Sequence, residues 1–167
     1  MARWREWFER LLEIIVIVLM VTLAVEVILG VTYRKLGMSL SWYDEIASVT
    51  LAWVTYYGAA LAALKGAHIG VPEIVQFMPR YWRVVTVYVA EFLIFGFMIL
   101  LGWTGMSVLD VLATDTLVSL PLVPVSYTQS VIPISAVLFI IAEALHFPER
   151  LAEARAGKPA ITATGDP

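Results

Sequence analysis

Long apolar runs dominate the pattern of this chain. Four segments reach the length of about 20 residues that a membrane helix needs, and none contains Lys or Arg. The third would be about 39 Å long at ~1.5 Å per residue, so we expect it to tilt or protrude from a hydrocarbon core of about 30 Å. The pattern predicts an all-α integral membrane protein with a single membrane domain over residues 1–156. The expected spans are residues 12–33, 45–64, 84–109 and 127–147.

The N-terminal residues have a different pattern. Apolar and aromatic side chains recur at helical spacing from Trp4 to Leu12, and charged side chains fill the other positions. This pattern predicts an amphipathic helix at the membrane interface, with a simple extension of the first span as the alternative. Residues 14–25 resemble the apolar region of a signal peptide, but no small-residue cleavage site follows, so we expect a retained helix. The polar residues 157–167 are predicted to be disordered.

Composition supports a membrane environment. Sixty per cent of the residues are hydrophobic and mean hydropathy is +0.84, whereas soluble domains are about 45–50% apolar. The chain has no cysteine, which excludes disulfides, thiolate metal sites and cysteine nucleophiles. A net charge of -3 gives no indication of nucleic-acid binding.

The positions of the basic residues predict the orientation. Only Arg34 and Lys35 lie on one side of the predicted spans, and the other nine lie on the opposite side. The positive-inside rule therefore places both termini in the cytoplasm. The nine are Arg3, Arg5, Arg10, Lys65, Arg80, Arg83, Arg150, Arg155 and Lys158.

We find no catalytic constellation in the sequence. The two histidines, His68 and His146, both fall at the cytoplasmic ends of predicted spans, which gives weak support for a pair of haem ligands. No three or four ligands cluster as a zinc site requires, and no serine has a histidine partner at a matching depth. We therefore expect a protein that is not an enzyme and has no cofactor or metal of its own.

Apart from Glu13 and Glu45 at the very start of their spans, three carboxylates lie within the apolar spans: Glu26, Glu91 and Glu143. Ionisable groups at such positions are rare and face protein or water. They could form an ion or proton relay, but they lie on separate helices with no shared spacing, which favours contacts with a neighbouring helix or subunit. Arg150 or Lys65 could approach Glu143. Arg83 is about 12 Å from Glu91 along a helix, at the limit of its reach, and Glu26 has no obvious partner.

The second span is rich in small residues. Gly58 and Ala62 are four residues apart, as are Ala59 and Ala63. Small side chains at this spacing allow membrane helices to approach closely, so this face is a candidate subunit contact.

Residues 41–71 carry a specific resemblance. They read SWYDEIASVTLAWVTYYGAALAALKGAHIGV, and this order of Trp, paired acids, second Trp, Gly-Ala-Ala, basic residue and His-Ile-Gly resembles the small membrane subunit of tripartite ATP-independent periplasmic (TRAP) transporters, the DctQ-like family. Two prolines fit the start of the family's last helix. This chain departs from the pattern in having one clear basic residue before the histidine, and in having Glu26 near a position where relatives have glutamine. The matching positions are Trp42, Asp44, Glu45, Trp53, Gly58, Ala59, Ala60, Lys65, His68, Ile69, Gly70, Pro124 and Pro133.

The resemblance implies a role within a larger assembly in the bacterial inner membrane. Such a system has a periplasmic substrate-binding protein, a large membrane subunit that carries the substrate and sodium sites, and a small subunit that acts as a scaffold. The expected substrates are small carboxylate-bearing solutes, imported with a sodium gradient and without ATP. The expected partners are the large subunit, the binding protein and membrane lipid.

The second span has acids at one end and basic residues at the other. Asp44 and Glu45 open the helix and Lys65 and His68 follow it, which suits the helix dipole. Trp42 would anchor the outer interface, where the acids could also pair with the large subunit. The outer loop before the last span carries Asp110 and Asp115 and no basic residue. It could dock the binding protein or serve as a plain connector.

Two alternatives remain open from the sequence. The first is a self-contained proton-coupled transporter that uses Glu26 or Glu91. The second is a membrane haem or quinone electron carrier that uses His68 and His146.

Overall fold

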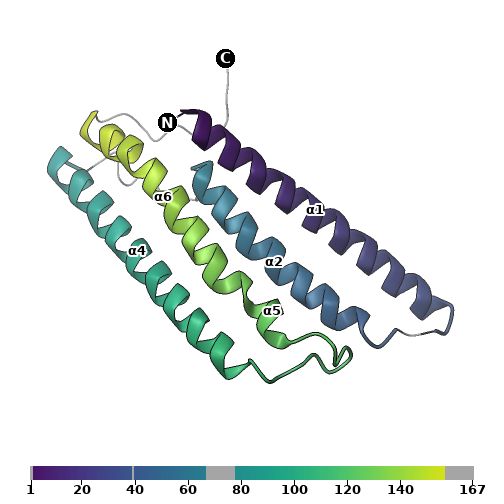
Figure 1. Cartoon of the computed structure of the whole chain (residues 1–167). Coiled ribbons are helices and arrows are strands. Elements are labelled where there is room, and N and C mark those ends of the chain that lie inside the picture. Colours follow the sequence, from purple (N-terminus) through teal and green to yellow (C-terminus); the bar gives the residue numbers. More distant parts are fainter. Residues whose placement is uncertain (1, 39, 67–77, 157–167) are drawn as a thin grey trace, which may run out of the picture.

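The computed structural model describes residues 2–38, 40–66 and 78–156. They form α1 (Ala2–Lys35), α2 (Tyr43–Leu64), α4 (Arg80–Val111), α5 (Val125–Gln129) and α6 (Val131–Ala156) (Figure 1). Among these residues, four helical stretches are long and apolar enough to cross a membrane: α1 from Arg5, α2, α4, and α5 with α6. The predicted all-α membrane class is therefore confirmed. The predicted tail, 157–167, lies outside the described residues.

Glycine and proline mark several helix boundaries. α1 ends just before Gly37 and α2 just before Gly66, and both glycines adopt positive φ values of 75° and 64°. Glycine adopts this left-handed conformation without the steric cost that other residues meet. Pro79 precedes α4 and Pro124 precedes α5. Pro133 cannot donate a backbone hydrogen bond to Gln129, and the last span is divided at Ser130 between α5 and α6.

The prediction of a separate N-terminal interfacial helix is wrong. Residues from Ala2 onward form one continuous helix with the first span, as in the alternative interpretation. No glycine or proline occurs before Gly30, so nothing in the chain interrupts the backbone hydrogen bonds where the pattern changes from amphipathic to fully apolar.

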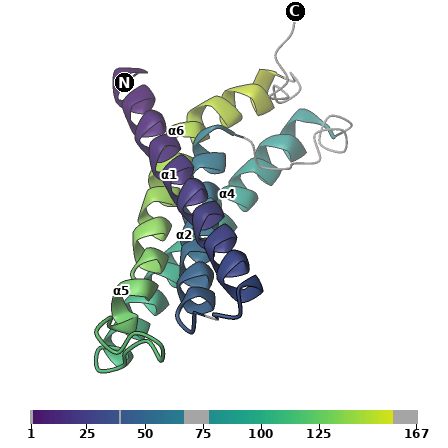
Figure 2. The ribbon, with the colours of Figure 1, turned by 90° about the vertical axis from the view of Figure 1, so that its right-hand side faces the viewer.

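The spanning helices stand in a row in the order α1, α2, α6, α4 (Figure 1). α2 packs against α1 and α6, and α6 packs against α2 and α4. Viewed along the row, α1 and α4 incline in opposite directions (Figure 2). α1 and α4 are therefore the two flanks, and they are the least buried of the four spans.

The main apolar core lies between α1, α2 and α6. Leu12, Leu64 and Phe139 are buried there together with small alanines of α2 and α6. The alanines let the helix backbones approach, and the large side chains fill the space between them. Both flank helices expose many large apolar side chains, which a bilayer or a partner chain would cover.

Candidate functional site

Both ends of the described chain lie at the same end of the helices (Figure 1). There, two buried carboxylates and a partly exposed arginine form an ionic cluster that joins α4 to α6. The Arg150 guanidinium donates through one nitrogen to Glu143 and, at 3.2 Å, to Glu91. Glu143 is 0% exposed and Glu91 is 4% exposed. Of the two basic residues expected to approach Glu143, Arg150 does so, whereas Lys65 pairs with carboxylates of α1. Arg150 rather than Arg83 also reaches Glu91. Glu91 and Glu143, two of the three predicted membrane carboxylates, therefore each contact the Arg150 side chain.

His146 supports the end of α2. Its Nε2 contacts the carbonyl oxygen of Leu64, which lies in the last turn of α2 and lacks a helical partner. Nδ1 lies 3.1 Å from Glu149, whose other oxygen accepts from Arg5 at 2.6 Å. Arg5 also lies 3.0 Å from Nε2, so this ring nitrogen contacts a carbonyl and a cation. This arrangement links α1, α2 and α6 across a sequence separation that no local pattern reveals.

Lys65 forms a second tie at the same end. Its ammonium pairs with Glu13 and lies 3.6 Å from Glu9, both on α1. The hydrogen bond to Glu13 raises the pKa of Lys65 above its usual value. Lys65 was predicted to follow the end of the second span, and the structure adds its two partners. His68 lies outside the described residues.

At the opposite end of the row, Glu45 holds a loop. Its two carboxylate oxygens accept hydrogen bonds from the backbone N–H groups of Val118, at 3.0 Å, and Ser119, at 2.8 Å. The Ser119 hydroxyl donates to the carbonyl of Ser41 at 3.1 Å. The second acid of the sequence motif therefore positions the segment between α4 and α5, a role that its place at a helix start did not reveal.

Trp53 contacts the last span close to Ser130, where that span is divided between α5 and α6. Its indole Nε1 donates to the carbonyl of Thr128 in α5 at 2.9 Å. By contrast, Asp44 remains exposed, forms a 3.5 Å ion pair with the exposed Arg34, and also interacts with the side chain of its neighbour Tyr43. Trp42 is also exposed. Of these four motif residues, Glu45 and Trp53 contact the segment between α4 and α6, whereas Trp42 and Asp44 remain exposed.

Glu26 of α1 contacts Thr50 of α2. The Thr50 hydroxyl donates to one of its oxygens at 3.4 Å, and the other oxygen is buried with no partner among the described residues. This contact is long for an O–H···O hydrogen bond. Glu26 thus has a polar neighbour that the sequence did not identify.

The loop between α4 and α5 is compact. The Leu117 N–H donates to the Val123 carbonyl at 3.0 Å, and the Val125 N–H donates to the Asp115 carbonyl at 2.9 Å. At its tip Val118 is 91% exposed and Leu122 is 96% exposed. Asp110, in the last turn of α4, and Asp115 are exposed as well. The predicted acidic surface is therefore accompanied by two projecting apolar side chains.

The small residues of α2 divide between two faces. Ala60 and Ala63 are fully buried in the core of this chain. A Cβ atom added at Gly58 would meet nothing within 4 Å, and Ala62 is half-buried. Gly58 and Ala62 therefore lie toward a side of α2 that the described residues cover only in part.

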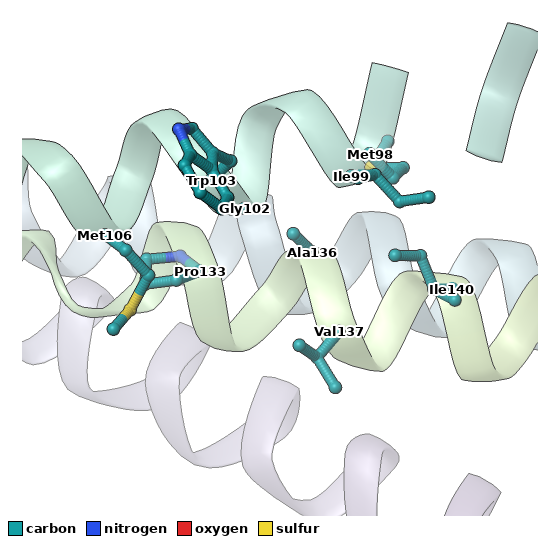
Figure 3. Close-up of a pocket in the computed structure, with 9 residues that line it drawn as sticks. All are labelled: Met98, Ile99, Gly102, Trp103, Met106, Pro133, Ala136, Val137 and Ile140. Carbon is teal, nitrogen blue, oxygen red and sulfur yellow. The ribbon is translucent and has the colours of Figure 1, made fainter. Parts of the chain in front are cut away.

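An apolar groove of about 520 Å³ lies between α4 and α6 (Figure 3). No ionisable side chain lines it, so it offers no polar recognition of a carboxylate solute. Nor does any group of three or more potential metal ligands occur in the part of the chain that the structure describes. The lining residues are Met98, Ile99, Gly102, Trp103, Met106, Pro133, Ala136, Val137 and Ile140.

Comparison with known families decides the assignment. Residues 23–153 match the family described as tripartite ATP-independent periplasmic transporters, DctQ component. The chain belongs to the DctQ family. It is therefore a component of a TRAP transporter, and the resemblance drawn from residues 41–71 is confirmed. No match was found among curated proteins.

Proposed function

We propose that this DctQ-family chain is the small scaffold subunit of a TRAP transporter, holding the large transport subunit in place while that subunit imports small carboxylate-bearing solutes with a sodium gradient. The row of spans is the observation that carries this proposal. α2 and α6 form its middle, and the flanks α1 and α4 leave broad apolar faces for lipid or a second membrane chain. An accessory chain of this shape widens the membrane domain to which it is attached.

The described polar groups favour support over transport. Glu91 and Glu143 are tied to Arg150, and the groove in the described chain is apolar. A solute pathway would need polar groups that converge on a cavity within the spans. The sodium and substrate sites belong in the large subunit, and this chain needs no cofactor for a scaffold role.

The orientation follows from the distribution of charge. The end of the row with Arg5, Lys65 and Arg150 faces the cytoplasm of a bacterial inner membrane, and both termini lie there. The loop with Asp115 and Leu122 then faces the periplasm, where an acidic surface with apolar tips can contact the substrate-binding protein. Reporter fusions at the C-terminus and at Asp115 test this orientation, and a periplasmic signal from the C-terminus would reverse it.

Two regions are candidates for the contact with the large subunit. Trp42 and Asp44 remain exposed at the outer end of α2, and Gly58 with Ala62 gives a close-approach surface further along the same helix. A basic side chain of the large subunit could replace Arg34 as the partner of Asp44.

Co-purification tests the scaffold role. The chain is co-expressed with a large TRAP membrane subunit of the same organism, and the complex is recovered through a tag on either chain. We expect a stable complex, and we expect Asp44→Asn to lower both its recovery and transport without changing the affinity of the binding protein for substrate. Glu6→Gln, a matched change at an exposed carboxyl of α1, serves as the control. Full transport by the large subunit alone would contradict the proposal.

A further inference from the structure

Glu91 and Glu143 share a single cation. Arg150 contacts one oxygen of each carboxylate, and the second oxygen of each is buried with no hydrogen-bond partner among the described residues. Two ionised carboxylates and one guanidinium would leave one uncompensated negative charge in an apolar interior. A buried charge without a partner is costly, and in proteins such a group becomes neutral instead.

The other charged groups around this cluster are engaged elsewhere. On α1, Arg5 pairs with Glu149, and Glu9 and Glu13 pair with Lys65 at the end of α2. On α6, His146 faces the Leu64 carbonyl and Glu149.

The remaining neighbours of the cluster supply no cation either. On α4, Arg83 lies two turns before Glu91; it forms no ion pair with any described carboxylate, and its Nε is buried without a hydrogen-bond partner among the described residues. Between Ile46 and Leu64, α2 carries no charged residue at all. Among the described groups, Arg150 alone offers positive charge to this cluster.

We propose that Glu91, Glu143 and Arg150 form a buried site that holds one proton, carried by Glu91. Two carboxylates that share a site do not both ionise easily, because each disfavours the charge of the other. Glu143 is the nearer partner of Arg150, so the proton is placed on Glu91. The proton comes from water and turns Glu91 into a neutral carboxyl with one hydrogen to donate.

This proton has a structural consequence. The cluster becomes electrically neutral, with one cation, one anion and one carboxylic acid, and it joins α4 to α6 within the membrane. The attachment of α4 then weakens at alkaline pH, because loss of the proton restores the uncompensated charge. This inference concerns the chain itself and stands whether or not the scaffold role is correct.

Infrared spectroscopy tests the site directly. The full-length chain is purified in lipid nanodiscs at neutral pH, together with its membrane partner where the two co-purify. We expect a carbonyl band of a protonated carboxyl group that shifts in D₂O and is lost in Glu91→Gln. Glu143→Gln should also abolish the band, because Arg150 then neutralises an ionised Glu91. Glu6→Gln should retain it, and a wild-type spectrum without a band that depends on Glu91 would overturn the proposal.

Thermal unfolding gives a second, independent measurement. We expect the Tm of the wild-type chain to fall as the pH is raised above neutral, whereas the Tm of Glu91→Gln should be at least as high at neutral pH and nearly independent of pH over the same range. The amide keeps the acceptor for Arg150 and has no proton to lose. A Glu91→Gln chain that still binds its membrane partner but follows the wild-type pH profile would overturn the proposal. If the Tm instead depended on sodium concentration at fixed pH, the site would hold a metal cation rather than a proton, and the proposal would be overturned.

Discussion

The two ends of the helices are held together differently. At the end where the described chain begins and finishes, charged side chains of different helices pair with one another. At the opposite end, side chains bind backbone groups of a loop. Arg150 joins two carboxylates, and Lys65 and Arg5 pair with further acids. At the loop end, Glu45 binds two N–H groups and Trp53 binds one carbonyl. Both sets of contacts join segments that are far apart in sequence.

The difference shows what each end positions. Ion pairs between helices set the placement of whole helices, and losing one partner leaves a charge behind. Hydrogen bonds from a side chain to loop backbone set the shape of a surface that water already reaches, so their loss affects that surface alone. Substitutions that remove the ion pairs should therefore destabilise the packing of all the helices. Substitutions that remove the contacts to the loop should change the loop alone.

Arg150→Met should have the largest effect. It leaves Glu91 and Glu143 buried without a cation, and breaking a buried pair in this way costs about 3–5 kcal/mol, with the lower end expected because protons can replace the charge. Unfolding in mixed micelles measures the loss. Arg155→Met changes an exposed arginine in the last turn of the same helix and is the control. Equal stabilities of the two variants would mean that the cluster does not hold the row together.

Gly105→Ala should have the next largest effect, in the half of the row near the loop. A Cβ there would lie 2.9 Å from Ile132 Cγ2 and 3.1 Å from Pro133 Cδ, so α4 and α6 would have to separate. Overpacking of this kind costs about 1–3 kcal/mol. Gly102→Ala is the matched control, because its Cβ would meet Ala136 at an ordinary 3.5 Å. If Gly105→Ala and Gly102→Ala both had the same unfolding free energy as the wild type, close packing at Gly105 would not contribute to stability.

Glu45→Ala should release the loop and leave the row intact. The N–H groups of Val118 and Ser119 lose their acceptor, so their hydrogen exchange should accelerate severalfold, while exchange in the middle of α6 stays unchanged. Asp44→Ala removes the neighbouring acid, which touches no loop backbone, and should leave both regions unchanged. Faster exchange throughout α6 in Glu45→Ala would show that the loop end also holds the helices.

Gly58→Ala should have the smallest effect on the chain itself. The added methyl meets nothing within 4 Å, and alanine favours a helix over glycine by about 1 kcal/mol, so stability should be equal or slightly higher. If the open face of α2 meets the large subunit, recovery of the complex should nevertheless fall. Unchanged recovery of the complex would mean that Gly58 is not part of the proposed contact. It would leave the conclusions about the ion pairs and the loop contacts unchanged.

Several features of the fold could be predicted because they depend on local pattern. Apolar runs of about 20 residues identify the four spans, and Asp44 and Glu45 do occupy the first turn of α2. The N-terminal prediction was wrong because an amphipathic pattern does not itself break a helix; without glycine or proline before Gly30, the backbone hydrogen bonds continue. The motif in residues 41–71 indicated the family, but it did not reveal which residues of the motif turn inward.

The sequence by itself determined the membrane class, the four spans, the charge asymmetry and the family, because length, hydropathy and short spacings are properties of neighbouring residues. Only the tertiary structure decided that Arg150 serves both Glu91 and Glu143, that His146 contacts the end of α2, and that Glu45 and Trp53 bind the loop and the helix break. Apart from the Arg150–Glu143 pair, these contacts join residues 59 to 82 positions apart. Such partners meet only when the helices pack in one order, with α2 and α6 between α1 and α4.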